Sequence, residues 1–147
     1  MIPPLVDYLQ ECMSHMGLGD ESDRLRVSIA LGEALSNAIH HGNLEVDSRL
    51  REQDEHAYHA CIRARQRLSP YSEREVVVQV SMSEEEATFS IRDEGPGFDV
   101  DALPDPTDKD HLENRAGRGI LLMKSFMDEV SYNDVGNVVV MTKRRSR

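Results

Sequence analysis

Apolar residues recur at helical spacing in the N-terminal part of the chain. Between residues 5 and 16 they fall every three or four positions, and two glycines follow, as is typical of a helix C-terminus. Asp20, with Asp23 three positions later, has the pattern of a helix N-cap. The pattern therefore predicts a short first helix and a longer second helix over residues 22–41, which ends at Gly42-Asn43.

The stretch from residue 44 to residue 74 carries a narrower stripe of mostly small side chains. The stripe recurs every 3 to 4 residues and predicts a third helix that stops before Pro70; its members are Leu50, Ala57, Cys61, Ala64 and Leu68. We expect this helix to pack against the sheet, and a helix that docks a partner is the alternative. His56 and His59 lie on it without a third metal ligand, so a solvated helix face is the favoured interpretation.

From residue 75 onward the apolar period changes to two, the spacing of β-strands. Each of two polar turns, 83–86 and 133–136, has an alternating segment on both sides, which predicts two β-hairpins. A segment rich in Gly, Pro and Asp over 94–116 and a predicted helix over 117–127 separate the hairpins.

This order of elements is typical of an α/β (α+β) two-layer sandwich, in which a mostly antiparallel, mixed sheet of about four strands packs against helices. A doubly wound parallel sheet requires alternating strands and helices, which this order lacks. The chain has 147 residues, the size of one domain, and contains no internal repeat or linker. A single domain over residues 1–147 is therefore predicted.

Charge and composition narrow the class of function. The formal charge of -10 argues against a general binder of nucleic-acid phosphates. The longest apolar runs are four residues, and no basic stretch or apolar signal core opens the chain, so neither a membrane span nor an export signal is predicted. Cys12 and Cys61 lie far apart without zinc-site spacing, which fits a reducing cytoplasm.

Polar side chains line one stripe of the predicted second helix. Glu33, Asn37 and His41 are spaced four apart and so project from the same side of the helix, beside an apolar face. An acid, an amide and an imidazole in this arrangement can build a site. Taken alone, they are better explained as a hydrated helix surface.

Two glycine-containing segments add candidate binding chemistry. Asp93 ends a predicted strand and can accept a hydrogen bond from an exocyclic amine, while Gly95 and Gly97 leave room for a ring. Residues 116–120 open a helix whose free N–H groups and positive dipole end suit a phosphate. An acidic turn and an ordinary glycine-containing helix start are the plain alternatives.

In this order the three segments resemble the motifs of the Bergerat-fold (histidine-kinase-like, GHKL) ATPases. The N box, first glycine box and second glycine box correspond to Glu33–Gly42, Asp93–Gly97 and Gly117–Gly119. The runs 117–130 and 136–143 most resemble the bacterial anti-sigma factor serine kinases. The resemblance covers roughly residues 20–43 and 75–145, most of the chain.

The resemblance implies ATP and Mg²⁺ as ligands. It makes Asn37 the Mg²⁺ ligand, Glu33 the general base and Asp93 the acceptor for the adenine amine, with Thr142 assisting through water. Arg118 would offset charge during phosphoryl transfer. The other residues that it places around the nucleotide are His41, Gly95, Gly97, Arg115, Gly117, Gly119 and Ile120.

The activity implied is that of an ATP-dependent serine/threonine protein kinase and anti-sigma-type regulator. Such a protein sequesters a sigma factor or similar regulator and phosphorylates an antagonist protein, and its oligomeric state, a homodimer included, stays open. A nucleotide-dependent sequestering module without phosphotransfer is one alternative, which Glu33 disfavours. The catalytic domain of a histidine kinase is another, but the helix that carries His15 is too short for a dimerising hairpin.

Three features depart from the family pattern or extend it. Family members usually begin with a strand, whereas this chain starts at a helix, which fits an excised domain or a truncated variant. Residues 44–74 form a helical insertion longer than the connection in compact members. Segment 94–116 resembles the ATP lid, and residues 93–113 hold eight acidic side chains against one lysine. We therefore expect this segment to order around arginines when nucleotide binds. A solvated acidic loop is the alternative.

Overall fold

The structure is a computed structural model, which describes residues 2–98 and 115–145. The elements along the chain are the helices α1 (Ile2–His15) and α2 (Glu21–Ser36), the π-helix η1 (Asn37–Asn43), α3 (Ser48–Gln53), α4 (Glu55–Arg65), the 3-10 helix η2 (Tyr71–Glu73), the strands β1 (Val77–Met82) and β2 (Glu86–Arg92), α6 (Arg115–Phe126), β3 (Glu129–Tyr132) and β4 (Val138–Arg144). The predicted lid lies mostly outside the described residues.

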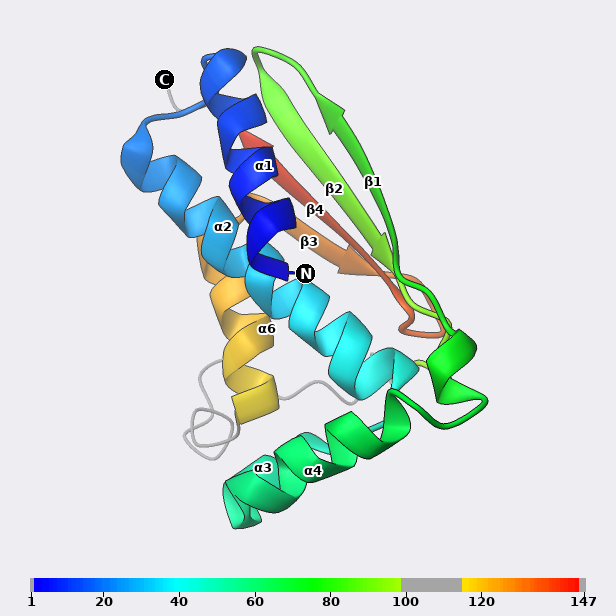
Figure 1. Cartoon of the computed structure of the whole chain (residues 1–147). Coiled ribbons are helices and arrows are strands. Elements are labelled where there is room, and N and C mark those ends of the chain that lie inside the picture. The colour runs from blue at the N-terminus through cyan, green and yellow to red at the C-terminus, as the bar shows by residue number, and fades with distance from the viewer. Residues whose placement is uncertain (1, 99–114, 146–147) are drawn as a thin grey trace.

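The four strands form one sheet in the order β1-β2-β4-β3. Every pair of neighbouring strands is antiparallel, and both predicted hairpins are present. The helices α1, α2 and α6 lie together on one side of this sheet (Figure 1). The predicted two-layer sandwich is therefore confirmed.

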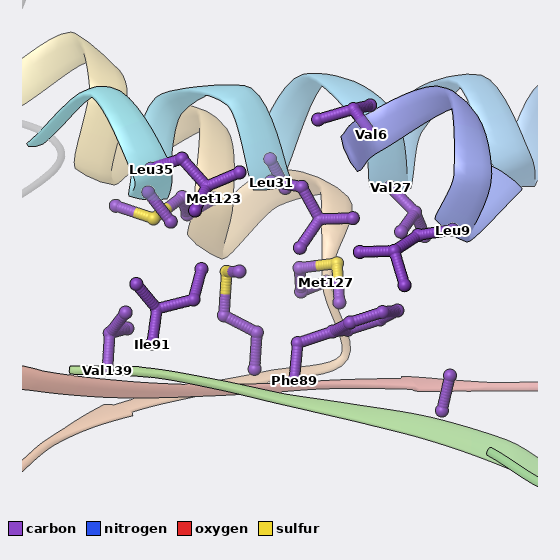
Figure 2. Packing of buried hydrophobic residues seen from close by; sticks show 14 of the residues in the cluster. Val6, Leu9, Val27, Leu31, Leu35, Phe89, Ile91, Met123, Met127 and Val139 are labelled. Carbon is purple, nitrogen blue, oxygen red and sulfur yellow. The ribbon is translucent and has the colours of Figure 1, made fainter. Parts of the chain in front are cut away.

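The core lies between these helices and the sheet (Figure 2). Val27, Leu31 and Leu35 from α2 face Phe89 and Ile91 from β2, and all five are at most 3% exposed. Burial of one such side chain stabilises the fold by about 1.5–3 kcal/mol.

Methionines supply an unusual share of this core. Met13, Met123 and Met141 are completely buried, and Met127 is 5% exposed. Met123 comes from α6, and Met127 directly follows the last residue of that helix, so thioether side chains line this part of the core.

The start of α2 follows the predicted N-cap. The Asp20 carboxylate accepts the N–H of Asp23 at 2.8 Å, and the Asp23 carboxylate accepts the N–H of Asp20 at 3.2 Å. This reciprocal capping box satisfies two N–H groups at the helix start. The predicted helix over 22–41 is α-helical only to Ser36, and its last turn continues as the π-helix η1.

The expectation of a single third helix that stops before Pro70 and packs against the sheet is wrong. The chain breaks at Asp54, whose side chain accepts the N–H of Ala57 at 3.0 Å and so starts α4 as a new helix. Tyr58 and Ile62 of α4 form a second apolar cluster with Leu44 and Val46, separate from the main core. Figure 1 shows α3 and α4 beside the ends of α2 and α6, away from the sheet.

No helix in the described ranges combines the length and the apolar content that crossing a bilayer requires.

Candidate functional site

Two of the predicted motifs meet where α2 and α6 pack together. A Cβ atom added to Gly119 of α6 would lie 2.8 Å from Glu33 Oε2 and 3.7 Å from Asn37 Nδ2. Glu33 lies in the last turn of α2, and Asn37 is the first residue of η1. The absence of a side chain at position 119 therefore lets a carboxylate and an amide reach the N-terminal half of α6.

The spacing predicted one stripe of Glu33, Asn37 and His41. The change from α-helix to π-helix at Asn37 turns His41 out of that stripe. The His41 Nδ1 hydrogen-bonds the carbonyl of Val46 at 2.6 Å, and the His41 ring lies 6.2 Å from the ring of Tyr58. These contacts hold His41 in the second apolar cluster. The structure thus brings Glu33 and Asn37 together with Gly119, and it does not bring His41 to them.

Asp93 lies just beyond the end of β2 and is 8% exposed. Its carboxylate accepts the N–H of Gly95 at 2.8 Å. Burial raises the pKa of Asp93 above its usual value, while the Gly95 N–H and the nearby charge of Arg74 act in the opposite direction. The result is a desolvated acceptor with few protein donors of its own.

Glycines allow the backbone to approach this carboxylate. A Cβ atom at Gly42 would lie 2.6 and 2.7 Å from the two Asp93 oxygens, and one at Gly95 would overlap the carbonyl of Gly42. A side chain at either position is therefore incompatible with this arrangement. The end of η1 and the turn after β2 are in direct contact here.

The next residues are held by the turn between β3 and β4. Gly97 has a φ of +78°, and a Cβ there would overlap the carbonyl of Val135. Phe98 donates its N–H to the same carbonyl at 3.0 Å, and its ring packs edge-on against Tyr132 at 5.0 Å. Burial and the charge of Asp93 raise the pKa of Tyr132 to about 12, so its hydroxyl stays protonated.

A comparison with known families assigns this arrangement. The sequence model of the histidine kinase-like ATPase domain matches residues 2–143. The chain belongs to this family. The resemblance stated from the three motifs is therefore confirmed, and membership of an ATPase family implies an ATP site in this domain.

The chain is also similar to a curated protein, the anti-sigma F factor of Bacillus subtilis (strain 168). The two are 35% identical over 81 residues, which cover 51% of this chain and 55% of that protein. The chain thus matches about half the length of this relative.

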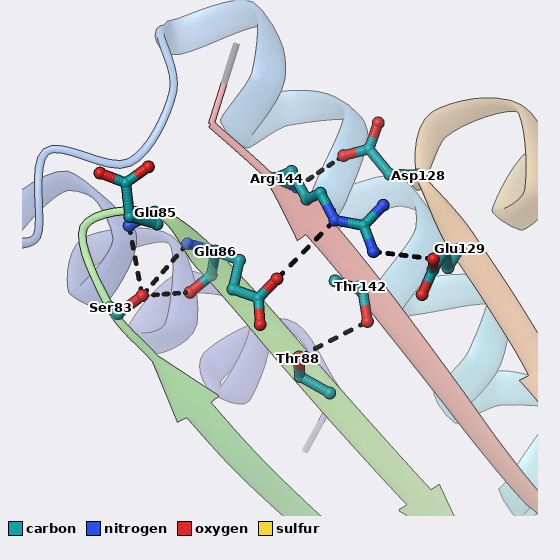
Figure 3. Close-up of polar contacts among 8 residues, drawn as sticks. All are labelled: Ser83, Glu85, Glu86, Thr88, Asp128, Glu129, Thr142 and Arg144. Carbon is teal, nitrogen blue, oxygen red and sulfur yellow. Dashed lines mark hydrogen bonds and ion pairs between the residues drawn. The ribbon is translucent and has the colours of Figure 1, made fainter.

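One residue assigned to the ATPase site needs correction. Thr142 pairs with Thr88 in the register of β2 and β4. Thr88 precedes Asp93 by five residues, so Thr142 lies roughly 16 Å from Asp93 at the rise of a strand. Its hydroxyl lies 3.5 Å from that of Thr88, in a polar group with Arg144 and Glu129 at the far end of the sheet (Figure 3). The residue that meets Asp93 on β4's side is Asn137, whose carbonyl accepts the Asp93 N–H at 2.9 Å.

The remaining predicted residues belong to α6. The backbone of α6 includes Arg115, Gly117 and Arg118. The side chains of the two arginines lie outside the described part of the chain. Gly119 is buried, and Ile120 is half-buried and packs against the main core. Ile120 therefore serves the fold through its side chain.

Two residues beside Asp93 were not predicted from the sequence. Asn43 is 5% exposed, and its side-chain oxygen accepts the N–H of Glu94 at 2.6 Å. Arg74 donates to the carbonyl of Asn43 at 2.8 Å. An asparagine that directly follows the glycine at the end of a predicted helix is only a weak signal of a site residue. The sequence around Arg74 gives no such signal.

Proposed function

We propose that this domain binds ATP together with Mg²⁺ and acts as a serine/threonine protein kinase and anti-sigma-type regulator, which phosphorylates an antagonist protein. The observation that carries the proposal is the contact of Gly119 with Glu33 and Asn37. It sets an acid and an amide beside the helix whose first N–H groups suit a phosphate. The similarity to an anti-sigma F factor supports the regulatory part, with a sigma factor or similar regulator as the sequestered partner.

The donor set fits a metal that arrives with the nucleotide. No group of three or more His, Cys, Asp or Glu gathers within the described ranges, so these residues offer no resident metal cage. Mg²⁺ takes oxygen ligands and commonly keeps substrate phosphates and waters among them. The Asn37 amide oxygen is the protein ligand that we assign to it.

Glu33 is the residue that we assign to proton transfer. It is half-buried, with one carboxylate oxygen against Gly119, and the serine or threonine hydroxyl of the antagonist would give its proton to this oxygen. The bound nucleotide would supply the transferable phosphoryl group. Asp93 would orient the adenine by accepting its amine, and Arg115 and Arg118 would offset negative charge.

The test is transfer of label from γ-labelled ATP in the presence of Mg²⁺ to purified candidate antagonists encoded near the gene. We expect label on a serine or threonine of one candidate. Glu33→Gln should bind ATP normally and transfer label about 100-fold more slowly or worse. Glu11→Gln, which changes an exposed acid on α1, is the matched control and should match the unmodified protein.

Two results would overturn parts of this proposal. Normal ATP binding without label on any candidate that binds the protein would favour a sequestering module without phosphotransfer. Transfer by Glu33→Gln at the unmodified rate would remove Glu33 from the chemistry.

A further inference from the structure

Three segments far apart in the sequence meet beside Asp93. Arg74 donates through one nitrogen to the carbonyl of Asn43 at 2.8 Å and to the carboxylate of Glu45 at 2.6 Å. Asn43 accepts the N–H of Glu94, and the Glu94 carboxylate accepts the N–H of Glu75 at 2.7 Å. Residues 43–45, 74–75 and 93–95 thus form one hydrogen-bonded network.

The network fixes the backbone on both sides of the Asp93 carboxylate. The Asp93 N–H is held by the carbonyl of Asn137 at 2.9 Å, and the following N–H, that of Glu94, is held by Asn43 at 2.6 Å. With both peptide planes fixed, few backbone torsions remain to alter the direction of the carboxylate. Asn43 is nearly completely buried, so loss of its oxygen would leave the Glu94 N–H without this acceptor.

Arg74 also acts on this site through its positive charge. Its side chain is 20% exposed and its charge lowers the pKa of Asp93, against the larger effect of burial. Three other ionisable groups among the described residues belong to this network or lie near Asp93. Glu45 is paired with Arg74, Glu94 accepts a backbone N–H, and Tyr132 stays neutral because burial raises its pKa to about 12.

The network is anchored from α4 as well. Arg65 donates to the carbonyls of Leu44 and Glu45 at 2.8 and 2.5 Å, and Glu45 has a φ of +52°. Arg65 and Arg74 both lie over the ring of Tyr71, at 5.0 and 5.3 Å. The residues after η1 are thus held in an uncommon backbone conformation by two arginines from outside the three motifs.

We propose that Asn43 and Arg74 are positioning residues for nucleotide recognition: Asn43 fixes the direction of the Asp93 carboxylate, and Arg74 holds residues 43–45 in place and brings its positive charge toward that carboxylate. The inference rests on the proposed function in so far as Asp93 binds adenine. It adds two residues that the three motifs do not contain and that act through Asp93 without touching the nucleotide.

Asn43→Ala tests the positioning of the carboxylate. We expect its affinity for ATP to fall about tenfold and its preference for ATP over GTP to narrow, because a misdirected acceptor no longer distinguishes an amine from a carbonyl. Calorimetry at a temperature where circular dichroism shows the variant folded gives both values. Gln79→Ala, which removes an exposed amide on β1, is the control.

Arg74→Met tests the charge. The Asp93 carboxyl, followed by carbon-detected NMR without nucleotide, should titrate at higher pH in Arg74→Met than in the unmodified protein, and the loss of ATP affinity on acidification should begin at correspondingly higher pH. Arg74→Lys keeps the charge and should restore most of the titration. Arg144→Met, which breaks an ion pair with Glu129 at the far end of β4, should leave Asp93 unchanged.

Unchanged ATP affinity and unchanged ATP-over-GTP preference in Asn43→Ala would overturn the role of Asn43, and an unchanged Asp93 titration in Arg74→Met would overturn that of Arg74. A lower melting temperature alone, with those readouts unmoved, would mean that the network only stabilises the fold. If the unmodified protein bound no ATP, the proposed function would fail, while the nucleotide-free titration would still decide whether Arg74 controls Asp93.

Discussion

Two glycines of one continuous helical segment should respond to the same substitution in opposite ways. Gly32 lies inside α2, where a Cβ atom would meet nothing within 4 Å. Gly42 lies in η1, where a Cβ would overlap the carboxyl carbon of Asp93 and lie 2.6 and 2.7 Å from its oxygens. Gly32→Ala and Gly42→Ala therefore differ in surroundings far more than in local chemistry.

The expected magnitudes follow from these contacts. Alanine in place of glycine inside a helix stabilises by about 0.5–1 kcal/mol, which is the whole effect at Gly32. At Gly42 the same gain is opposed by overpacking, which costs about 1–3 kcal/mol when a buried neighbour must move. Ordinary carbon contacts are about 3.5–4.0 Å, so the Asp93 carboxyl would have to shift by about 1 Å. We expect Gly42→Ala to be destabilised by about 1–2 kcal/mol.

The assay is thermal and urea unfolding of the two variants and the unmodified protein without nucleotide. At about 3 °C per kcal/mol for a domain of this size, Gly32→Ala should melt up to about 3 °C higher and Gly42→Ala about 3–6 °C lower. An equal dependence on urea concentration would show that the unfolded states are comparable. A Gly42→Ala protein that melts at or above Gly32→Ala would refute the close contact between η1 and Asp93.

Two further substitutions address the nucleotide. Asp93→Asn should weaken ATP binding by about 2 kcal/mol or more and remove the preference for ATP over GTP. Calorimetry measures both effects. Equal affinity of the unmodified protein for ATP and GTP would contradict the assignment of Asp93 to adenine. The same variant should melt higher at neutral pH without nucleotide. The folded-state pKa of Asp93 is raised, so stability from this group is lost as pH rises through that pKa, and the neutral amide avoids the loss. Asn37→Ala should bind ATP like the unmodified protein in EDTA and lose the gain that Mg²⁺ gives, measured by titration with and without the metal.

Local patterns predicted much of this architecture. Periods of 3.6 and 2 placed the main helices and the two hairpins, because each element buries one face against the other layer. The spacing of Glu33 and Asn37 correctly indicated a shared direction, since they are one helical turn apart. The break at Asp54 was missed because an aspartate within a helical pattern is compatible with both a solvated face and a new N-cap.

Contacts between distant segments were less accessible to such patterns. The stripe of small residues between 44 and 74 did not include Tyr58, which belongs to the second apolar cluster. The family resemblance implied a role for Thr142 beside Asp93, but strand register decides which residue faces Asp93, and nothing local specifies that register. Asn43 and Arg74 meet across 31 positions of sequence, so only the folded chain brings them together.

The methionines of the core have a mechanical consequence for α6. An unbranched thioether can change its torsions and refill space where a branched side chain would leave a void. Met123 of α6 and Met127, which directly follows that helix, belong to the same buried cluster as Met141 of β4. Rotation about the bonds of these side chains would therefore accommodate a small displacement of α6, the helix that carries Gly119.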